Sequence, residues 1–351
     1  MPSFFRRNVE AMEGYVPGEQ PRDADSVVKL NTNENPYPPS RAVGEALSSF
    51  DASMLRLYPD PMCRAFREAA AEAHGVSPEN IIVGNGSDDI LTIATRSFVP
   101  EGGLIAKVSP SYTLYRTLAE IQGAACLDIP LEEDFSLPFD AAESAEGASL
   151  FFLPRPNAPT GTAFAKDAVR GLCERFDGVV LIDEAYAAFA DDDCLDLPFE
   201  YPNAIVSRTL SKSHSLAGAR LGYAIATEEM VAGMMKVKDS YNVNALTQAL
   251  ATAAIKDGAW LEENVRNIRG NRAALSAALS GMGFDVVESA ANFVLASPPD
   301  GGAKALYERL KSDGIFVRWF DEDRVRRFVR ITVGTEKEIE SLLSALRRVY
   351  G

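Results

Sequence analysis

The sequence predicts an α/β protein with a mainly parallel sheet, followed by a smaller α+β domain. Between residues 75 and 230, short apolar runs rich in β-branched residues alternate with longer amphipathic segments, the pattern of strands joined by helices. Two long helical patterns without any strand signal then fill residues 244–282. After them the order of elements changes, which indicates a second unit of α+β type.

Each expected element follows from a local pattern. The helical segments of the first unit are 88–99, 112–122 and 166–176, where apolar residues recur at helical spacing. Its expected strands are the runs IIVGNG, LIAKVSP, SLFFLP, GVVLIDEAY, NAIVSRTL and LGYAIAT. The second unit has a helical pattern near 302–313, another at the chain end, and strand patterns in FDVVES, NFVLAS, GIFVRWF and FVRITVG.

Length and composition divide the chain into three parts. The first 40 residues are rich in proline and asparagine, as in NTNENPYPPS, which disfavours regular structure and suits an arm laid over another surface. A length of 351 residues favours two domains over one. We therefore expect an arm (1–40) that joins the small domain, a large ligand-binding domain (41–260) and a small C-terminal domain (261–351).

Charge and cysteine usage exclude several classes of function. The chain has 35 Lys and Arg against 50 Asp and Glu, a net charge of −15, which disfavours binding to nucleic acid or to an anionic membrane. Four scattered cysteines and two histidines disfavour a metal site and fit a cytoplasmic protein with reduced thiols. The sequence shows no export signal and no run of 18 apolar residues, so we expect no membrane span.

Ligands of an open α/β sheet bind beyond the carboxyl ends of its strands, so the turns after the strands are the place to search. In VGNGSDD, two glycines permit a tight turn, and Ser87 and Asp88 open a helix whose N–H groups can hold a phosphate. An ordinary glycine turn with an N-cap is the alternative. In SPSYTLY, Tyr112 follows a strand and either lies flat on an aromatic ligand or simply opens a helix.

Three further turns carry polar groups. In LPRPNAPTG, prolines and a glycine fix the backbone around Asn157, which then presents a donor or belongs to a merely stiff loop. In VVLIDEAY, Asp183 ends a buried apolar run, where a carboxylate needs a partner unless it caps a helix. In SRTLSKSHSLAGARLGY, Ser211, Lys212 and Arg220 place cations and hydroxyls in one loop, although a lone lysine is usually a surface residue.

Pyridoxal phosphate (PLP) is one ligand that requires a contact of the kind that each of these five turns can supply. It requires a lysine that forms a Schiff base with its aldehyde and a carboxylate that keeps its pyridine nitrogen protonated. It also requires a donor for its phenolic oxygen, an aromatic side chain against its ring and a cup for its phosphate. The protonated ring is an electron sink for the carbanion formed at the α-carbon of a substrate.

The motifs also resemble those of a known family. The sequence is similar to the PLP-dependent aminotransferases of fold type I, and most similar to the histidinol-phosphate aminotransferases. That fold has a mainly parallel seven-stranded sheet flanked by helices, plus a smaller α+β domain. The family's motifs occur here in its order, from residue 30 to residue 335: LNTNENPYPPS, YPDP, NGSDD, PNAPTG, LIDEAY, TLSKSHSLAGARLGY, GIFVRWF and VRITVGT.

The resemblance implies a role for each matching residue at the ring of the cofactor. Lys212 would be the Schiff-base lysine, which also moves the proton during transamination. Asp183 would pair with the pyridine nitrogen, and Tyr112 would stack on the ring. Asn157 and Tyr186 would bond the phenolic oxygen.

The resemblance also implies how the phosphate is held. Ser87 and Asp88, mainly through backbone N–H groups, would surround it together with Ser211 and Arg220. Tyr58, in RLYPDP, matches a tyrosine that reaches the phosphate from the neighbouring subunit. The active unit would therefore be a homodimer.

Four residues match positions that contact the substrate. Arg330, in FVRITVG, matches the arginine that binds the α-carboxylate of glutamate or the phosphate of histidinol phosphate, and a guanidinium suits either group. Arg318, in GIFVRWF, resembles a further substrate arginine, with a surface position at a strand end as the alternative. Tyr15 and Asn33 occupy arm positions that close over the site.

Three positions depart from the family pattern. Ala158 replaces the second asparagine before PTG, and Arg155 stands where a serine is common. Arg155 either adds a cation near the site or braces the loop. His214 follows the lysine by two residues, and we expect it to pack rather than to face the cofactor.

The resemblance implies transamination between histidinol phosphate and 2-oxoglutarate, giving imidazole-acetol phosphate and glutamate, a step of histidine biosynthesis. Aminotransfer from aromatic amino acids is a close alternative, because pocket shape sets the side-chain preference. A threonine-phosphate decarboxylase of the same fold is another. A non-catalytic binding module is a third alternative, and Lys212, Asp183 and Arg220 argue against it.

Overall fold

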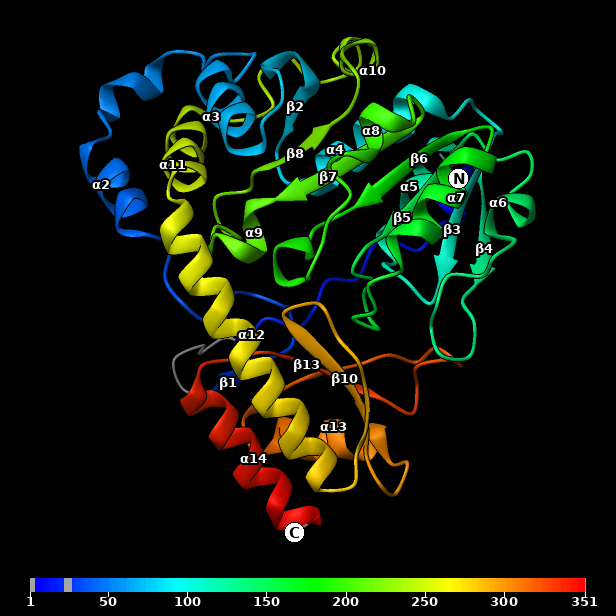
Figure 1. Ribbon diagram of the computed structural model, residues 1–351, viewed down its shortest axis with the longest axis vertical. Coiled ribbons are helices and arrows are strands. Elements are labelled where there is room, and N and C mark those ends of the chain that lie inside the picture. The colour runs from blue at the N-terminus through cyan, green and yellow to red at the C-terminus, as the bar shows by residue number, and fades with distance from the viewer. Residues whose placement is uncertain (1–3, 22–26, 351) are drawn as a thin grey trace.

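A seven-stranded sheet forms the centre of the larger part of the molecule (Figure 1). The computed structural model describes residues 4–21 and 27–350, so residues 1–3 and 22–26 of the expected arm lie outside the described residues. The strand order is β2-β8-β7-β6-β5-β3-β4, and β8 runs antiparallel to both of its neighbours while β3 to β7 are parallel. Its strands are β2 (Ile81–Gly84), β3 (Leu104–Ser109), β4 (Ala125–Pro130), β5 (Leu150–Pro154), β6 (Val179–Asp183), β7 (Ala204–Thr209) and β8 (Gly222–Ile225).

The mainly parallel seven-stranded sheet expected from the sequence is therefore confirmed. Six of the seven strands fall in the apolar runs identified above. The strand β4 is the exception, because it lies at the edge of the sheet and leaves several of its residues partly exposed. A strand that is only partly buried has a weaker apolar signal than a central one.

Helices cover both faces of the sheet, because alternate strand residues point to opposite sides. One face packs against α4 (Ser87–Phe98), α5 (Leu114–Gln122) and α10 (Glu228–Met234), around strand residues such as Phe152 and Leu181. The other face packs against α6 (Ala141–Ser144), α7 (Lys166–Arg175) and α8 (Leu197–Glu200), around Phe151 and Ile182. The helices expected over 88–99, 112–122 and 166–176 are thus present as α4, α5 and α7.

A third group of helices closes the β2 and β8 edge of the sheet. It consists of α2 (Arg41–Ser49), α3 (Arg64–His74) and α11 (Ala245–Lys256), which pack on Ile81, Val83 and Ile225. The short helix η2 (Ala52–Arg56) lies between α2 and α3, η3 (Pro78–Asn80) connects α3 to β2, and η4 (Ala187–Phe189) follows β6. The long helix α12 (Gly258–Gly281) then leads away from the sheet, beside α14 (Glu336–Tyr350), toward the C-terminal part (Figure 1).

The C-terminal part contains a four-stranded antiparallel sheet of order β12-β13-β10-β9. It has a core of its own with α12, α13 and α14. The arm supplies a short helix, α1 (Arg7–Ala11), and a strand, β1, which pairs in parallel with β11. The remaining bounds are β1 (Val28–Lys29), β9 (Asp285–Val287), β10 (Phe293–Ser297), α13 (Ala303–Ser312), β11 (Ile315–Phe316), β12 (Arg318–Trp319) and β13 (Val329–Thr332).

The topology brings three separate parts of the chain to the carboxyl ends of the parallel strands. These are the turns after the strands, the arm, and the strands β12 and β13. In the described part of the chain, every helix is too short or too polar to cross a membrane.

Candidate active site

A cavity of about 330 Å³ opens at the carboxyl ends of the parallel strands. Its walls come from the turns after the strands, from the arm and from the C-terminal sheet. Most of the residues selected from the sequence line it. They are Tyr15, Asn33, Ser87, Asp88, Tyr112, Asp183, Tyr186, Ser211, Lys212, Arg220, Arg318 and Arg330.

One end of the cavity has the features of a phosphate site. Ser87 is the first residue of α4, so the N–H groups of Ser87 and Asp88 have no partner within the helix, whereas the Asp89 N–H donates to the Gly86 carbonyl at 3.2 Å. Gly86 precedes it with φ +87°, and a Cβ there would lie 2.4 Å from Nη2 of Arg220. A glycine is therefore required for the guanidinium to lie against this helix end. Arg220 donates to Asp88 Oδ2 at 3.3 Å.

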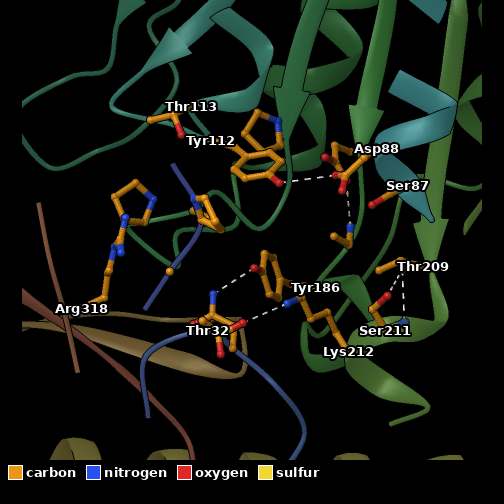
Figure 2. A pocket seen from close by; sticks show the side chains of 18 of the residues that line it. Thr32, Ser87, Asp88, Tyr112, Thr113, Tyr186, Thr209, Ser211, Lys212 and Arg318 are labelled. Carbon is orange, nitrogen blue, oxygen red and sulfur yellow. Dashed lines mark hydrogen bonds between the residues drawn. The ribbon is translucent and has the colours of Figure 1, made fainter. Parts of the chain in front are cut away.

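Hydroxyl groups complete this end of the cavity (Figure 2). Thr209 caps the short helix α9 (Leu210–Ser213) by accepting from the Ser211 N–H at 3.1 Å. The Ser211 hydroxyl in turn accepts from Arg220 Nη1 at 3.3 Å. Arg220 itself has φ +58°, an uncommon conformation for a residue with a side chain. Thr209 is not among the site residues expected from the sequence, although it is a typical N-cap residue directly before LSK.

Lys212 is a buried amine. It lies in α9, and its Nζ donates to the Thr32 carbonyl at 3.2 Å (Figure 2). Burial, and then the nearby Arg330 guanidinium, lower the pKa of Lys212 from 10.5 to about 8. About a tenth of this amine is therefore neutral at pH 7, and the neutral form is the one that acts as a nucleophile or a proton acceptor.

Asp183 is a buried carboxylate at the end of β6. The Tyr115 hydroxyl donates to its Oδ2 at 2.8 Å, and the Ala185 N–H donates to its Oδ1 at 3.2 Å. Burial raises the pKa of Asp183 from 3.8 to about 6, although these hydrogen bonds oppose the shift. Tyr115 was not selected from the sequence. Its position three residues after Tyr112, one helical turn along the same face, was the available signal.

The three remaining residues chosen for the cofactor ring come from three different turns. Tyr112 lines the cavity, with its hydroxyl 3.4 Å from Asp88 Oδ1 (Figure 2). The Tyr186 hydroxyl accepts from Asn33 at 2.9 Å. Asn157 is fully buried between two lining residues, and its amide donates to the Pro110 carbonyl and to Thr160. The Asn157 Oδ1 has no partner in the described part of the chain.

The opposite side of the cavity carries two arginines. Arg318 and Arg330 face each other on the paired strands β12 and β13. Arg330 donates to the Asn31 carbonyl at 3.0 Å, and its Nε has no hydrogen-bond partner among the residues that the structure describes. Neither guanidinium forms an ion pair with any described residue. Burial and the nearby Arg318 lower the pKa of Arg330, which indicates a site short of negative charge.

Four of the residues discussed above have other surroundings. Tyr58 is 81% exposed and stacks on Tyr241, away from the cavity of its own chain. His214 is buried with its Nδ1 2.9 Å from the Ser213 hydroxyl, so it packs as expected. Arg155 is also buried and donates to the Phe164 carbonyl and to Asp192. It therefore braces its loop, which was one of the two roles expected for it. Ala158 lines the cavity and packs against Phe293.

The residues present fit PLP as a ligand. The cavity joins a phosphate-binding helix end, a buried amine and a buried carboxylate, each supplied by a different turn. Within the described residues, no cluster of histidine, cysteine or acidic side chains has the arrangement of a metal site. The fold and this set of groups define a PLP-type aminotransferase class.

Comparison with known proteins agrees with this class. The family model for aminotransferase class I and II matches residues 25–346. Histidinol-phosphate aminotransferase 1 of Trichormus variabilis is 45% identical over 347 residues, covering 99% of each chain. The histidinol-phosphate aminotransferase of Syntrophotalea carbinolica is 46% identical over 342 residues, covering 97% of this chain and 98% of that protein.

A solved structure gives the same result. Histidinol-phosphate aminotransferase from Sinorhizobium meliloti, in complex with pyridoxal-5'-phosphate, superposes with a TM-score of 0.91 at 26% identity. The superposition covers 100% of this chain and 98% of that one. The chain therefore belongs to the class I and II aminotransferases, and within them to the histidinol-phosphate aminotransferase family.

Proposed function

We propose that this enzyme binds PLP in the cavity and transfers an amino group from histidinol phosphate to 2-oxoglutarate. The products are imidazole-acetol phosphate and glutamate. The observation that carries the proposal is a buried lysine with a pKa near 8 in the same cavity as a buried carboxylate and two arginines that form no ion pair within the described part of the chain. The relatives described above act on histidinol phosphate by name, which favours this reaction over the aromatic and decarboxylase alternatives.

The phosphate of PLP would occupy the end of the cavity formed by α4 and α9. Backbone N–H groups at Ser87 and Asp88, the Ser211 hydroxyl and the Arg220 guanidinium are the donors there. Both cationic and neutral donors suit a phosphate, since charge-assisted hydrogen bonds are the stronger ones. The helix end supports this placement further, because its dipole favours a negative charge.

PLP, when bound, supplies an electron sink for the bond broken at the substrate's α-carbon. Asp183 would hold the positive charge of the ring nitrogen, and the Tyr115 hydroxyl keeps this carboxylate in position. Asn157 and Tyr186 would bind the phenolic oxygen, and Tyr112 would pack on the ring. Asn157 must exchange one of its present amide hydrogen bonds to do so.

Lys212 moves the proton of the reaction. Its Nζ would accept the proton from the α-carbon of the amino donor and deliver it to the aldehyde carbon of the cofactor, because a pKa near 8 makes both uptake and release of a proton accessible near neutral pH. The buried position excludes water, which would otherwise compete as a base. Arg330 and Arg318 bind the carboxylates of glutamate or the phosphate of histidinol phosphate, while Tyr15 and Asn33 cover the site from the arm.

A half-reaction screen tests this function. The purified enzyme with bound PLP is mixed with histidinol phosphate, phenylalanine, glutamate or threonine phosphate, and the visible spectrum is followed. We expect histidinol phosphate and glutamate to remove the visible absorption of the bound cofactor. Preference for phenylalanine would identify an aromatic aminotransferase instead, and release of carbon dioxide from threonine phosphate would identify a decarboxylase.

We also propose that the active unit is a cytoplasmic homodimer in which Tyr58 reaches the site of the second copy. Its exposure and its stacking on Tyr241, with ring centroids 4.6 Å apart, support this. Further apolar side chains are exposed on the same segment, namely Leu47, Met54, Leu55 and Leu57. Such a group of exposed apolar residues is typical of an interface.

Subunit mixing tests the shared site. Tyr58→Ala and Lys212→Ala each inactivate every site of their own homodimers if Tyr58 acts across the interface. A mixed dimer then has one site that retains both residues, so we expect activity to return when the two inactive variants are unfolded and refolded together. If the mixture stays inactive while it forms dimers in sedimentation, Tyr58 acts within its own chain or has no role.

A further inference from the structure

The two arginines of the cavity are held in an electrostatically unfavourable arrangement. Arg318 and Arg330 are direct cross-strand partners on β12 and β13, and like charges in such a pair destabilise a sheet. No described residue offers either guanidinium a carboxylate, and the Arg318 guanidinium makes no hydrogen bond among the described residues. Something other than an ion pair must therefore keep the two side chains in place.

A single aromatic ring lies under both of them. The guanidinium carbon of Arg318 lies 5.5 Å from the ring centroid of Phe320, and that of Arg330 lies 5.3 Å from the same centroid. Arg330 also lies 5.2 Å from the centroid of Phe293. Cations are attracted to the face of an aromatic ring, so Phe320 offers a negative surface where the described chain offers no carboxylate.

Phe320 is itself fixed by the larger part of the molecule. It packs against the core cluster that contains Phe135 and Phe328, whose rings are in edge-to-face contact. Arg324, in the same loop as Phe320, donates to the carbonyl of Leu131. The ring therefore has a defined position relative to the central sheet, and not only relative to the strands that carry the arginines.

We propose that Phe320 is a positioning residue that holds Arg318 and Arg330 as one two-cation site. The ligand class is an anion with several acceptor oxygens, either the carboxylates of a dicarboxylic amino or oxo acid or a phosphomonoester. This inference rests on the proposed function, because it assigns to the Phe320 ring the positioning of the two arginines that bind the substrate of that reaction. Its basis is the ring shared by two unpaired arginines and its packing on the large-domain core.

The variant Phe320→Leu tests the proposal, because it keeps an apolar side chain and removes the ring. Phe320→Tyr keeps the ring face, and Phe139→Leu is the matched control. Phe139 also lies beneath an arginine, Arg175 at 4.4 Å, but it is exposed and does not line the cavity. The probe is 2-oxoglutarate, titrated by calorimetry into each enzyme with bound PLP, and glutamate kinetics follow.

We expect Phe320→Leu to raise the Kd for 2-oxoglutarate and the KM for glutamate about tenfold, the loss expected for about two cation–π contacts. The kcat should change less than about twofold, because the ring touches no reacting atom. Phe320→Tyr and Phe139→Leu should behave as the unaltered enzyme. Thermal melting should show that all variants are folded, and Phe320→Met replaces the leucine variant if that one is not.

Three results would overturn the proposal. One is an unchanged Kd in both Phe320→Leu and Phe320→Met. Another is an equal loss in Phe320→Tyr, since the shape of the side chain would then matter instead of its ring face. The third is a loss confined to kcat. If the unaltered enzyme binds 2-oxoglutarate but leaves histidinol phosphate unchanged, the proposed function fails, and the Kd comparison still decides the role of Phe320.

Discussion

Replacing Asp183 by asparagine should stabilise the protein without its cofactor while it removes the activity. Burial raises the pKa of Asp183 from 3.8 to about 6, a difference of about two units, and each unit corresponds to ~1.36 kcal/mol. Keeping this carboxylate charged in the folded, cofactor-stripped protein therefore costs about 3 kcal/mol at pH 7. Asparagine has no charge to bury, and it retains an oxygen that accepts from Tyr115.

The stability gain of Asp183→Asn should depend on pH, because the pKa of Asp183 is raised in the folded protein. The folded protein binds more protons at this site than the unfolded chain does between pH 3.8 and about 6. The contribution of Asp183 to the free energy of unfolding therefore falls as the pH rises through that window. After about 1 kcal/mol is subtracted for a weakened hydrogen bond, the expected net gain of Asp183→Asn is about 2 kcal/mol at pH 7.5. The gain should be clearly smaller at pH 5.

Urea unfolding of the cofactor-stripped proteins at pH 5 and pH 7.5 measures this difference. The control is Asp167→Asn, whose carboxylate is almost fully exposed in a surface ion pair and should change stability little at either pH. With PLP bound, Asp183→Asn should lose turnover by about 100-fold or more, the scale seen when a preorganised polar group is removed. If Asp183→Asn is no more stable than the unaltered protein at pH 7.5, the buried charge of Asp183 does not destabilise the folded protein and the reasoning is wrong.

Three other substitutions have expected outcomes. Lys212→Ala should abolish the covalent PLP adduct that borohydride traps, and mass spectrometry that still detects an adduct would assign the covalent role to another lysine. Arg155→Ser should lower the free energy of unfolding by about 3 kcal/mol, because the fully buried Glu184 loses a neighbouring cation; an unchanged urea midpoint would contradict this. Tyr115→Phe should shift the acid limb of the pH–rate profile to higher pH, because it removes the hydroxyl that lowers the pKa of Asp183. An acid limb at the same pH would show that the Tyr115 hydroxyl does not affect the titration of Asp183 during turnover.

Much of the large sheet could be predicted from the sequence because its central strands are buried on both faces. Runs such as GVVLIDEAY are apolar without interruption, and a run of that length next to an amphipathic helix has few other interpretations. The edge strand β4 gave a weaker signal because its residues are partly exposed. The arm shows the same limit, since β1 is only two residues long and depends on a partner strand far away in the chain.

The site could be predicted only where chemistry and turn position coincide. Asp183 is the last residue of β6, and Ser87 and Lys212 lie within three residues of the ends of β2 and β7, so the rule that ligands bind beyond the strand ends found them together. Tyr115 and Phe320 carry no comparable signal, because their roles depend on contacts with Asp183 and with two arginines of the C-terminal sheet. Contacts of this kind belong to tertiary packing, which no local pattern contains.

The charges of the cavity share one property that links stability to function. Burial disfavours the charge of Lys212, of Asp183 and of Arg330 alike, and so moves the two basic groups down in pKa and the acidic group up. A protonated ring nitrogen carries the charge complementary to Asp183, and a substrate carboxylate or phosphate carries the charge complementary to Arg330. Each of them would bring the pKa of the residue that it contacts back toward its ordinary value, so that binding would offset the unfavourable energy of the buried charge. The same reasoning explains why Asp183→Asn should be both more stable and less active, because the substitution removes the unfavourable charge together with the interaction it provides.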